Sequence, residues 1–312
     1  MYPISRRSLL ASAALAGTPL WAKKNHIGRD RISTITDENA KSPAEAIAFA
    51  KQYGLQWVEL RNVPGEKRHY IQLSEGELKQ AAAEFKEAGL RVSFLNSGML
   101  KFTMPGTEQP KRRPETDEAK AKRLANEQRM FDNRMQELDK AILAAHILGV
   151  SKVRIFAFMR VAEPMALLPK IAEVFQPMVK VAEKQGIQLL LENEAACNVG
   201  TCAELAVMMK LINSKAFGLN WDPLNAVHLL EEQFPFGYSL LPKKRIQNVQ
   251  IKGKSILAGP EKLDWVAIFN ALEKDDYQGQ VGLECHIFER LVEASHDSMK
   301  EILRICEDRR SS

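Results

Sequence analysis

The sequence predicts an α/β protein that is a single (β/α)8 TIM barrel preceded by an N-terminal export signal. Short β-rich runs alternate with helical patterns eight times from residue 31 onward, and this alternation is typical of such a barrel. No Pro/Ser-rich linker divides the chain, which favours one domain. An open, doubly wound sheet is the alternative. It would ordinarily carry a Gly-rich phosphate-binding turn, and neither a G-x-G-x-x-G nor a P-loop pattern occurs.

Strands are predicted where β-branched and other apolar residues form short runs between polar residues or glycines. The runs cover residues 31–36, 57–61, 91–96, 152–158, 187–192, 216–221, 246–251 and 281–285. The fifth run, IQLLLE, is almost continuously apolar. Such a run is typical of a strand that is buried on both faces, as in a parallel sheet.

Helical patterns fill the intervals between these strands. They cover residues 43–53, 75–88, 115–148, 164–185, 202–212, 264–273 and 293–307, with a weaker turn at 227–232. Gly89, Gly149 and Gly186 directly follow three of these helices. Glycine is favoured there because the residue after a helix often adopts a left-handed conformation.

The first 25 residues are predicted to be a separate signal segment, with the barrel domain at 26–312. Paired arginines, Arg6 and Arg7, precede an apolar, Ala-rich stretch from Leu9 to Leu20. This pattern resembles a bacterial twin-arginine export signal. The stretch is shorter than the roughly 20 residues of a membrane-spanning helix, so removal or loose anchoring is expected. The predicted location is the periplasm, and the predicted partner is the twin-arginine export machinery.

Composition excludes some classes of function. The formal net charge is only +5, and the basic stretch at 111–134 interleaves lysine and arginine with acidic residues. That pattern is typical of a solvated helix face, so nucleic-acid binding is not expected. The four cysteines are too few and too scattered for a disulfide scaffold. They are expected to be small buried residues.

Polar residues mark the carboxyl ends of the last four strands, where the active sites of barrels of this kind lie. They are Glu192, Asp222, Gln250 and Glu284, each separated from the next by about one βα unit. Three carboxylates at one barrel mouth would repel each other at low dielectric, so a cation is expected among them. Oxygen ligands of this kind suit Mn²⁺ or Mg²⁺ better than a thiolate-bound Zn²⁺.

Several segments carry a resemblance to a known family. LENEAACNVGT, LNWDPLNA, GYSLLPKKRIQNVQIKG and YQGQVGLECH resemble successive motifs of the xylose-isomerase-like TIM-barrel superfamily of sugar isomerases and epimerases. WVELR and VSFLNSGMLK resemble its second and third strands. The resemblance implies a divalent metal, with Mn²⁺ expected first and Mg²⁺, Co²⁺ or Zn²⁺ as alternatives. Carried over position by position, the implied metal ligands are Glu192, Asp222, Gln250 and Glu284.

One strand departs from the commonest pattern of this superfamily. Many members read H-V-H-V-K-D in the seventh strand, where this chain reads Asn248 to Gly253, N-V-Q-I-K-G. Members that resemble hydroxypyruvate isomerase use Gln at the ligand position, which keeps Gln250 as a candidate. The departure leaves the affinity and identity of the metal open.

The resemblance also implies a chemistry, namely removal of a proton from the carbon next to a carbonyl. Glu192 and Glu284 are the expected acid/base pair. For each of them the alternative is a metal ligand without a proton role, or a carboxylate held in a buried ion pair. The residues expected to contact substrate are Glu59, Lys101, Arg154, Glu194, Lys252 and His286. For His286 a role in holding a neighbouring side chain is the alternative, and Lys252 could instead balance carboxylate charge.

Four functions compete at this point. The first is a sugar or keto-sugar isomerase or epimerase, with a small carbohydrate as substrate and homo-oligomerisation left open. The second is a keto-glycoside lyase that uses the same residues. The third is a DNA-repair endonuclease on the same barrel. It is less favoured, because the endonuclease branch of the superfamily looks rich in His for a cluster of three zinc ions and this chain has only six His. A non-catalytic sugar-binding barrel is the fourth.

Overall fold

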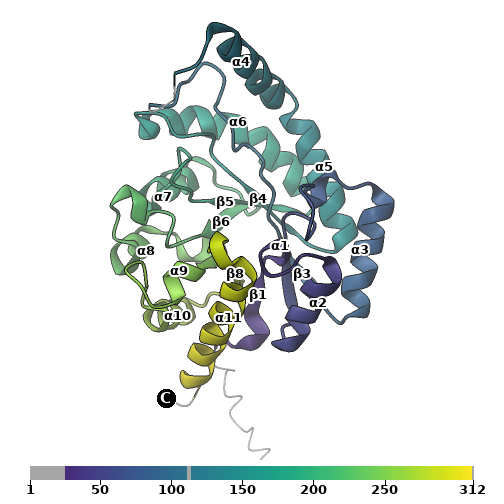
Figure 1. Ribbon diagram of the computed structural model, residues 1–312. Helices are drawn as coiled ribbons and strands as arrows, with labels where there is room; N and C mark the ends of the chain where they lie inside the picture. Colours follow the sequence, from purple (N-terminus) through teal and green to yellow (C-terminus); the bar gives the residue numbers. More distant parts are fainter. Residues whose placement is uncertain (1–24, 111–113, 311–312) are drawn as a thin grey trace, which may run out of the picture.

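A computed structural model describes residues 25–110 and 114–310 and confirms the (β/α)8 barrel (Figure 1). Eight parallel strands follow the order β1-β8-β7-β6-β5-β4-β3-β2, and a parallel bridge between Ile35 and Glu59 joins β1 to β2. The strands are β1 (Ile32–Thr34), β2 (Trp57–Leu60), β3 (Arg91–Leu95), β4 (Lys152–Ile155), β5 (Gln188–Glu192), β6 (Phe217–Trp221), β7 (Ile246–Lys252) and β8 (Gln280–Glu284). The predicted export signal lies outside the described residues, apart from Asn25.

Helices surround the sheet on its outer side (Figure 1). They are α1 (Thr36–Asn39), α2 (Pro43–Gln52), α3 (Glu75–Glu87), α4 (Asp117–Asp132), α5 (Arg134–Leu148), α6 (Pro164–Lys184), α7 (Cys202–Leu211), α8 (Tyr238–Leu240), α9 (Gly253–Ile256), α10 (Trp265–Lys274) and α11 (Leu291–Asp308). Gly89, Gly149 and Gly186 all have positive φ angles, as their positions after helices predicted. Within residues 25–110 and 114–310, no helix combines the length and the apolar character that crossing a bilayer requires.

The long helix predicted at 115–148 is wrong in one respect, because the structure divides it in two. α4 ends and α5 begins at Asn133, whose φ of −83° and ψ of 0° leave the helical conformation. The two halves differ in what they bury. α4 buries only Glu127 among its described side chains, whereas α5 buries an apolar stripe that includes Leu138 and Ile142. α5 therefore packs on the barrel while α4 projects from it (Figure 1).

The fourth strand is shorter than predicted. It ends at Ile155, because the next backbone N–H groups pair with the segment after β3. Phe156 donates to Met99 O at 3.0 Å and Phe158 donates to Leu100 O at 3.0 Å. The chain leaves the sheet at this point.

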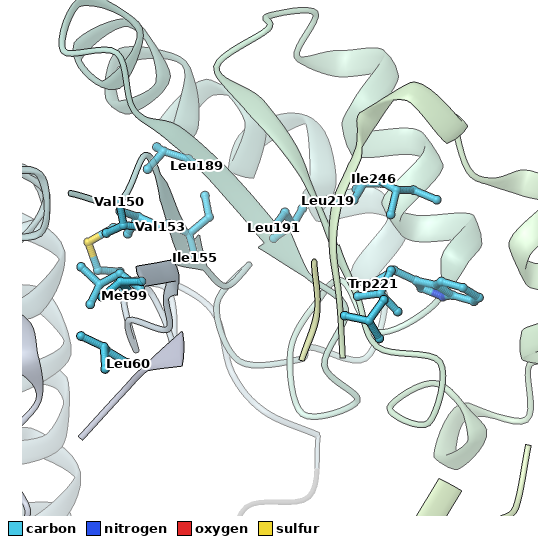
Figure 2. Close-up of a cluster of buried hydrophobic side chains, with 14 of the residues drawn as sticks. Leu60, Met99, Val150, Val153, Ile155, Leu189, Leu191, Leu219, Trp221 and Ile246 are labelled. Atoms are coloured by element: carbon cyan, nitrogen blue, oxygen red, sulfur yellow. The ribbon is translucent and has the colours of Figure 1, made fainter. Parts of the chain in front are cut away.

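The apolar core lies between the strands and the surrounding helices. Figure 2 shows Val153 and Ile155 of β4 close to Leu189 and Leu191 of β5. Side chains alternate along a strand, so the residue between the first pair, Arg154, faces the interior of the barrel. All four cysteines are free and buried, as predicted.

The barrel interior is largely polar. Its inward-facing side chains include buried Ser33, Asn220 and Asn248, with Glu59 at 0% exposure. Gly282 of β8 also faces inward, and a Cβ atom there would lie 2.0 Å from Glu59 Oε1. Position 282 therefore needs glycine, because the Glu59 carboxylate occupies the space that a side chain would take.

Candidate active site

Three carboxylates converge at the carboxyl ends of β5, β6 and β8. Glu192 ends β5, Asp222 directly follows β6, and Glu284 ends β8. Each offers an oxygen atom, and these atoms all lie within 4.8 Å of one another. None of the three residues is more than 2% exposed. Ionised carboxylates cannot be buried this closely without positive charge between or beside them.

Two buried cations from the neighbouring strands supply that charge. Lys252, the last residue of β7, places Nζ 3.0 Å from Asp222 Oδ2 and 2.5 Å from Glu284 Oε2. Arg154 of β4 places Nη1 3.0 Å from Glu192 Oε2. Both residues were expected to face the pocket, and the structure brings both to the carboxylates.

A second group of charges lies on the far side of Glu284. His286 Nε2 is 3.0 Å from Glu284 Oε1 and 3.1 Å from Glu38 Oε1. Arg61 contacts the same two carboxylates, at 3.0 Å from Glu284 Oε1 and 2.8 Å from Glu38 Oε1. It also lies 3.0 Å from Asp37 Oδ2. Glu284 is thus held by cations on both of its oxygens.

Sequence reasoning missed Arg61, Glu38 and Asp37. Arg61 directly follows β2, and the two acidic residues lie in α1 just after β1. The signal that could have found them is their place at strand ends. For the end of the second strand the sequence prediction was Glu59, and no residue was predicted from the end of the first strand.

The pKa values reflect this arrangement of charges. Burial would raise the pKa of Glu284, but Lys252 and His286 hold it well below its usual range. Burial would lower the pKa of His286, but Glu284 and Glu38 raise it to about 9. Burial raises the pKa of Asp222 to about 6, since Lys252 only partly offsets burial and the two neighbouring carboxylates. At neutral pH, Glu284 is therefore ionised and His286 is protonated.

Gln250 of β7 is buried two residues before Lys252 and is anchored from inside the barrel. Its Nε2 donates to Glu59 Oε2 at 2.7 Å, so the amide oxygen Oε1 is directed elsewhere. Gln250 Oε1 is buried and accepts no hydrogen bond from the described residues. Asp222 Oδ2 is paired with Lys252 Nζ at 3.0 Å and accepts no hydrogen bond from the other described residues. A buried oxygen without a hydrogen-bond donor, such as Gln250 Oε1, is available as a cation ligand.

Glu59 was expected to contact substrate, and its surroundings argue against that role. Its carboxylate accepts hydrogen bonds from Ser33, Asn96, Asn248 and Gln250. It is fully buried, and these four side chains occupy both of its oxygens. Glu59 does not face a substrate because other side chains of the barrel interior surround this position of β2.

Lys101 and Glu194 lie together at the rim of the mouth. Lys101 Nζ is 2.7 Å from Glu194 Oε2, and the lysine side chain is 39% exposed. The Lys101 ammonium also lies 4.6 Å from the centre of the Phe156 ring. The pair is thus available to a ligand that enters from solvent.

A hollow of about 1370 Å³ lies at the opposite, amino-terminal end of the barrel. Several of its charged side chains contact each other or nearby backbone. Arg31 donates to Asn25 and to carbonyl groups of Tyr277 and Gly279. Glu273 pairs with Arg309 at 2.6 Å. We assign no chemistry to this end.

Residues 47–306 match the family model described as the xylose isomerase-like TIM barrel. The chain belongs to this family. No curated protein matches the sequence. Membership in the xylose isomerase-like family confirms the resemblance seen in the strand motifs, although it leaves the export signal untested.

Solved structures of this fold superpose on most of the chain. The 3-keto-D-glucoside 4-epimerase from E. coli has a TM-score of 0.61 at 16% identity, over 88% of this chain and 98% of that one. The IOLI protein with a bound zinc atom has a TM-score of 0.66 at 14% identity, over 89% and 98%. D-allulose 3-epimerase from Methylomonas sp. in complex with D-allulose has a TM-score of 0.61 at 17% identity, over 92% and 99%. At these identities the likeness shows the shared fold.

The donor set suits a hard or borderline divalent cation. Carboxylate and amide oxygens are the ligands that Mg²⁺ and Mn²⁺ prefer, and Zn²⁺ also accepts carboxylates. Glu192, Asp222 and Glu284 lie close enough together to share one ion, and Gln250 offers an unpartnered oxygen. The residues present therefore fit a divalent metal, and their geometry does not distinguish one metal from another.

Proposed function

We propose that this barrel is a divalent-metal-dependent isomerase or epimerase of a sugar or keto-sugar. The observation that carries the proposal is the convergence of Glu192, Asp222 and Glu284 within 4.8 Å. The bound zinc of the IOLI structure and the epimerase activity named for two structures of this fold support it. Glu192, Asp222, Gln250 and Glu284 would hold the metal, with Mn²⁺ as the first candidate.

The proposed reaction moves one proton at a carbon next to a carbonyl. Glu192 and Glu284 lie on strands β5 and β8 and approach the mouth from different sides. One of them, in its ionised form, removes the proton and becomes protonated. The other starts protonated and donates its own proton to the opposite face of the same carbon or to its neighbour, and exchange with solvent restores both groups. A bound divalent ion would supply positive charge that stabilises the enediolate oxygens.

The other residues of the mouth have roles that follow from their contacts. Arg154 is 3.0 Å from Glu192 and 3.9 Å from Glu284, so it holds the two proposed acid/base groups in a fixed relation. His286, protonated at neutral pH, keeps Glu284 ionised and ready to accept a proton. Lys101 and Glu194 at the rim offer a cation and an anion to substrate hydroxyl groups.

The test is proton exchange with solvent. Protein loaded in turn with Mn²⁺, Mg²⁺, Co²⁺ or Zn²⁺ is incubated in deuterated water with free ketoses and with keto-glycosides. The expected result is incorporation of deuterium next to the carbonyl, lost after chelation and restored by metal. Release of the glycosidic substituent without epimer would instead identify a lyase. Tight sugar binding without exchange on the whole panel would identify a binding protein and contradict the proposal.

We also propose that the chain is exported by the twin-arginine route to the periplasm, on the basis of Arg6, Arg7 and the apolar stretch after them. Residues 1–30 fused to a reporter should direct it to the periplasm. Replacement of both arginines by lysine should retain the reporter in the cytoplasm. Export of the doubly substituted fusion at the original rate would contradict the proposal.

A further inference from the structure

We infer that Lys252 competes with the metal. Its ammonium group occupies the oxygens of Asp222 and Glu284 that the rest of the site leaves open. Lys252 thereby sets the affinity of the site for the divalent cation. This inference rests on the proposed metal site. It assigns a role to Lys252 other than contact with substrate.

The contacts of Asp222 show which of its oxygens is open. Asp222 Oδ1 accepts the backbone N–H groups of Leu224 and Asn225, at 3.0 and 3.2 Å. Apart from Lys252, no described residue donates a hydrogen bond to Oδ2. Within the part of the chain that the structure describes, Lys252 is the one cation paired with Asp222, and it approaches this open oxygen.

The two oxygens of Glu284 likewise have different partners. Oε1 contacts Arg61 and His286, both at 3.0 Å. Oε2 contacts Lys252 at 2.5 Å. On both carboxylates the ammonium therefore engages the oxygen that a divalent cation would need.

The backbone holds Lys252 in this position. The next residue, Gly253, donates its N–H to Cys285 O of the neighbouring strand end at 2.9 Å. A Cβ atom on Gly253 would lie 2.8 Å from Cys285 O and 3.0 Å from Cys285 Sγ. Glycine thus allows the end of β7 to lie against the end of β8, and Lys252 is only 5% exposed there. The main chain that carries the Lys252 side chain is therefore fixed at the barrel mouth.

Two opposite effects follow from this placement. Without metal, Lys252 offsets the repulsion among buried carboxylates and so stabilises the fold. When a divalent cation binds, the same charge repels it and competes for the same oxygens. Removal of the charge should therefore weaken the metal-free protein and tighten metal binding.

The test compares wild type, Lys252→Met and Lys254→Met in the full chain. Lys254 lies two residues further on. Its side chain is 54% exposed and, among described acidic groups, contacts only Glu261, at 3.8 Å. It is therefore a matched control for the loss of a charge.

Mn²⁺ affinity is measured by calorimetry against a competing chelator, and Tm is measured with EDTA or with saturating Mn²⁺. Lys252→Met should bind Mn²⁺ about tenfold or more tightly than wild type. It should also have a lower Tm in EDTA and a larger gain in Tm with Mn²⁺. Lys254→Met should match wild type in each measurement.

If Lys252→Met does not fold, Lys252→Gln, which keeps a hydrogen-bond donor without the charge, replaces it with the same expected direction. Mn²⁺ affinity equal to or weaker than that of wild type in the folded variant would overturn the inference and leave the proposed function standing. Absence of Mn²⁺, Mg²⁺, Co²⁺ and Zn²⁺ binding by wild type and variant alike would overturn the proposed metal site as well.

Discussion

Gln250 Nε2 donates a hydrogen bond of 2.7 Å to Glu59 Oε2 inside the barrel, so the amide oxygen of Gln250 points away from Glu59. That oxygen is buried and has no hydrogen-bond partner among the described residues. Glu59, expected from the sequence to contact substrate, is in this view the residue that presents Gln250 as a ligand.

Replacement of Glu59 by glutamine should weaken metal binding about 10- to 100-fold, the range found when a residue that orients a metal ligand is changed. Four donors now share its two oxygens, and glutamine would leave them a single acceptor oxygen. Ser33→Ala is the matched control, because Ser33 donates to Glu59 Oε1 and does not touch Gln250. Calorimetric titration with Mn²⁺ measures both. Equal affinity for Glu59→Gln and wild type would contradict the orienting role.

Replacement of Glu192 or Glu284 by glutamine should reduce solvent exchange of the substrate proton by about 10²- to 10⁴-fold, the usual contribution of a positioned acid or base. Glutamine keeps the shape of the side chain but cannot accept the proton. The measurement is made at saturating metal, with metal content determined in parallel, so that a lost ligand is not mistaken for a lost base. Exchange at the wild-type rate in a fully metallated variant would assign that residue to metal binding alone.

Replacement of Arg61 by methionine should destabilise the protein by about 3 kcal/mol or more, because it removes a cation that three buried carboxylates share. Arg61 contacts Asp37, Glu38 and Glu284, and its side chain is 17% exposed. Arg304→Met removes an arginine that is 58% exposed and paired with Glu301 and Asp308. That control should cost less than about 1 kcal/mol. Chemical denaturation in EDTA measures both, and similar losses would show that the Arg61 network contributes little.

Lys152 gives a prediction of pH dependence away from the mouth. Burial lowers the pKa of Lys152 to about 8, so the folded protein gives up this proton more readily than the unfolded chain. Below pH 8 both states are protonated, and the charge destabilises the fold by on the order of 3 kcal/mol. The penalty disappears as the pH rises from about 8 to the unfolded value of 10.5.

Lys152→Met should therefore be more stable than wild type at pH 7, with the difference shrinking toward pH 10.5. Denaturation curves at several pH values measure this directly. Lys170→Met, on the exposed side of α6, is a control for a general effect of losing a lysine. A stability difference that stays constant between pH 7 and 10.5 would contradict the lowered pKa.

The alternation of strands and helices was sufficient to predict the barrel, because each βα unit carries its own local pattern. The strand-end rule also selected Glu192, Asp222 and Glu284, since parallel strands deliver their carboxyl ends to one place. The division at Asn133 was missed because both halves consist of residues compatible with a helix. What separates them is packing, which depends on the rest of the molecule.

The surroundings of Glu59 could not be predicted, because they depend on the register between strands. The pairing of β2 with β3 shifts between Val58 and Glu59, and such a shift leaves no mark in the sequence of either strand. Its partner Gln250 lies 191 residues away in the sequence. The same limit applies to Lys252. Alternation of side chains along the strand predicts that it points inward with Gln250, but it does not predict which oxygen atoms the ammonium contacts.

A row of polar contacts crosses the barrel interior from one proposed ligand to another. Asn220 donates to Glu192 at 2.6 Å, Asn248 donates to Asn220 at 3.0 Å and to Glu59 at 3.3 Å, and Glu59 receives Gln250. Changes at the two ends of such a row are not independent. Epistasis between positions 192 and 250 is therefore built into the barrel. Evolution or design that exchanges the glutamine of β7 for histidine would have to rebuild the interior row together with it.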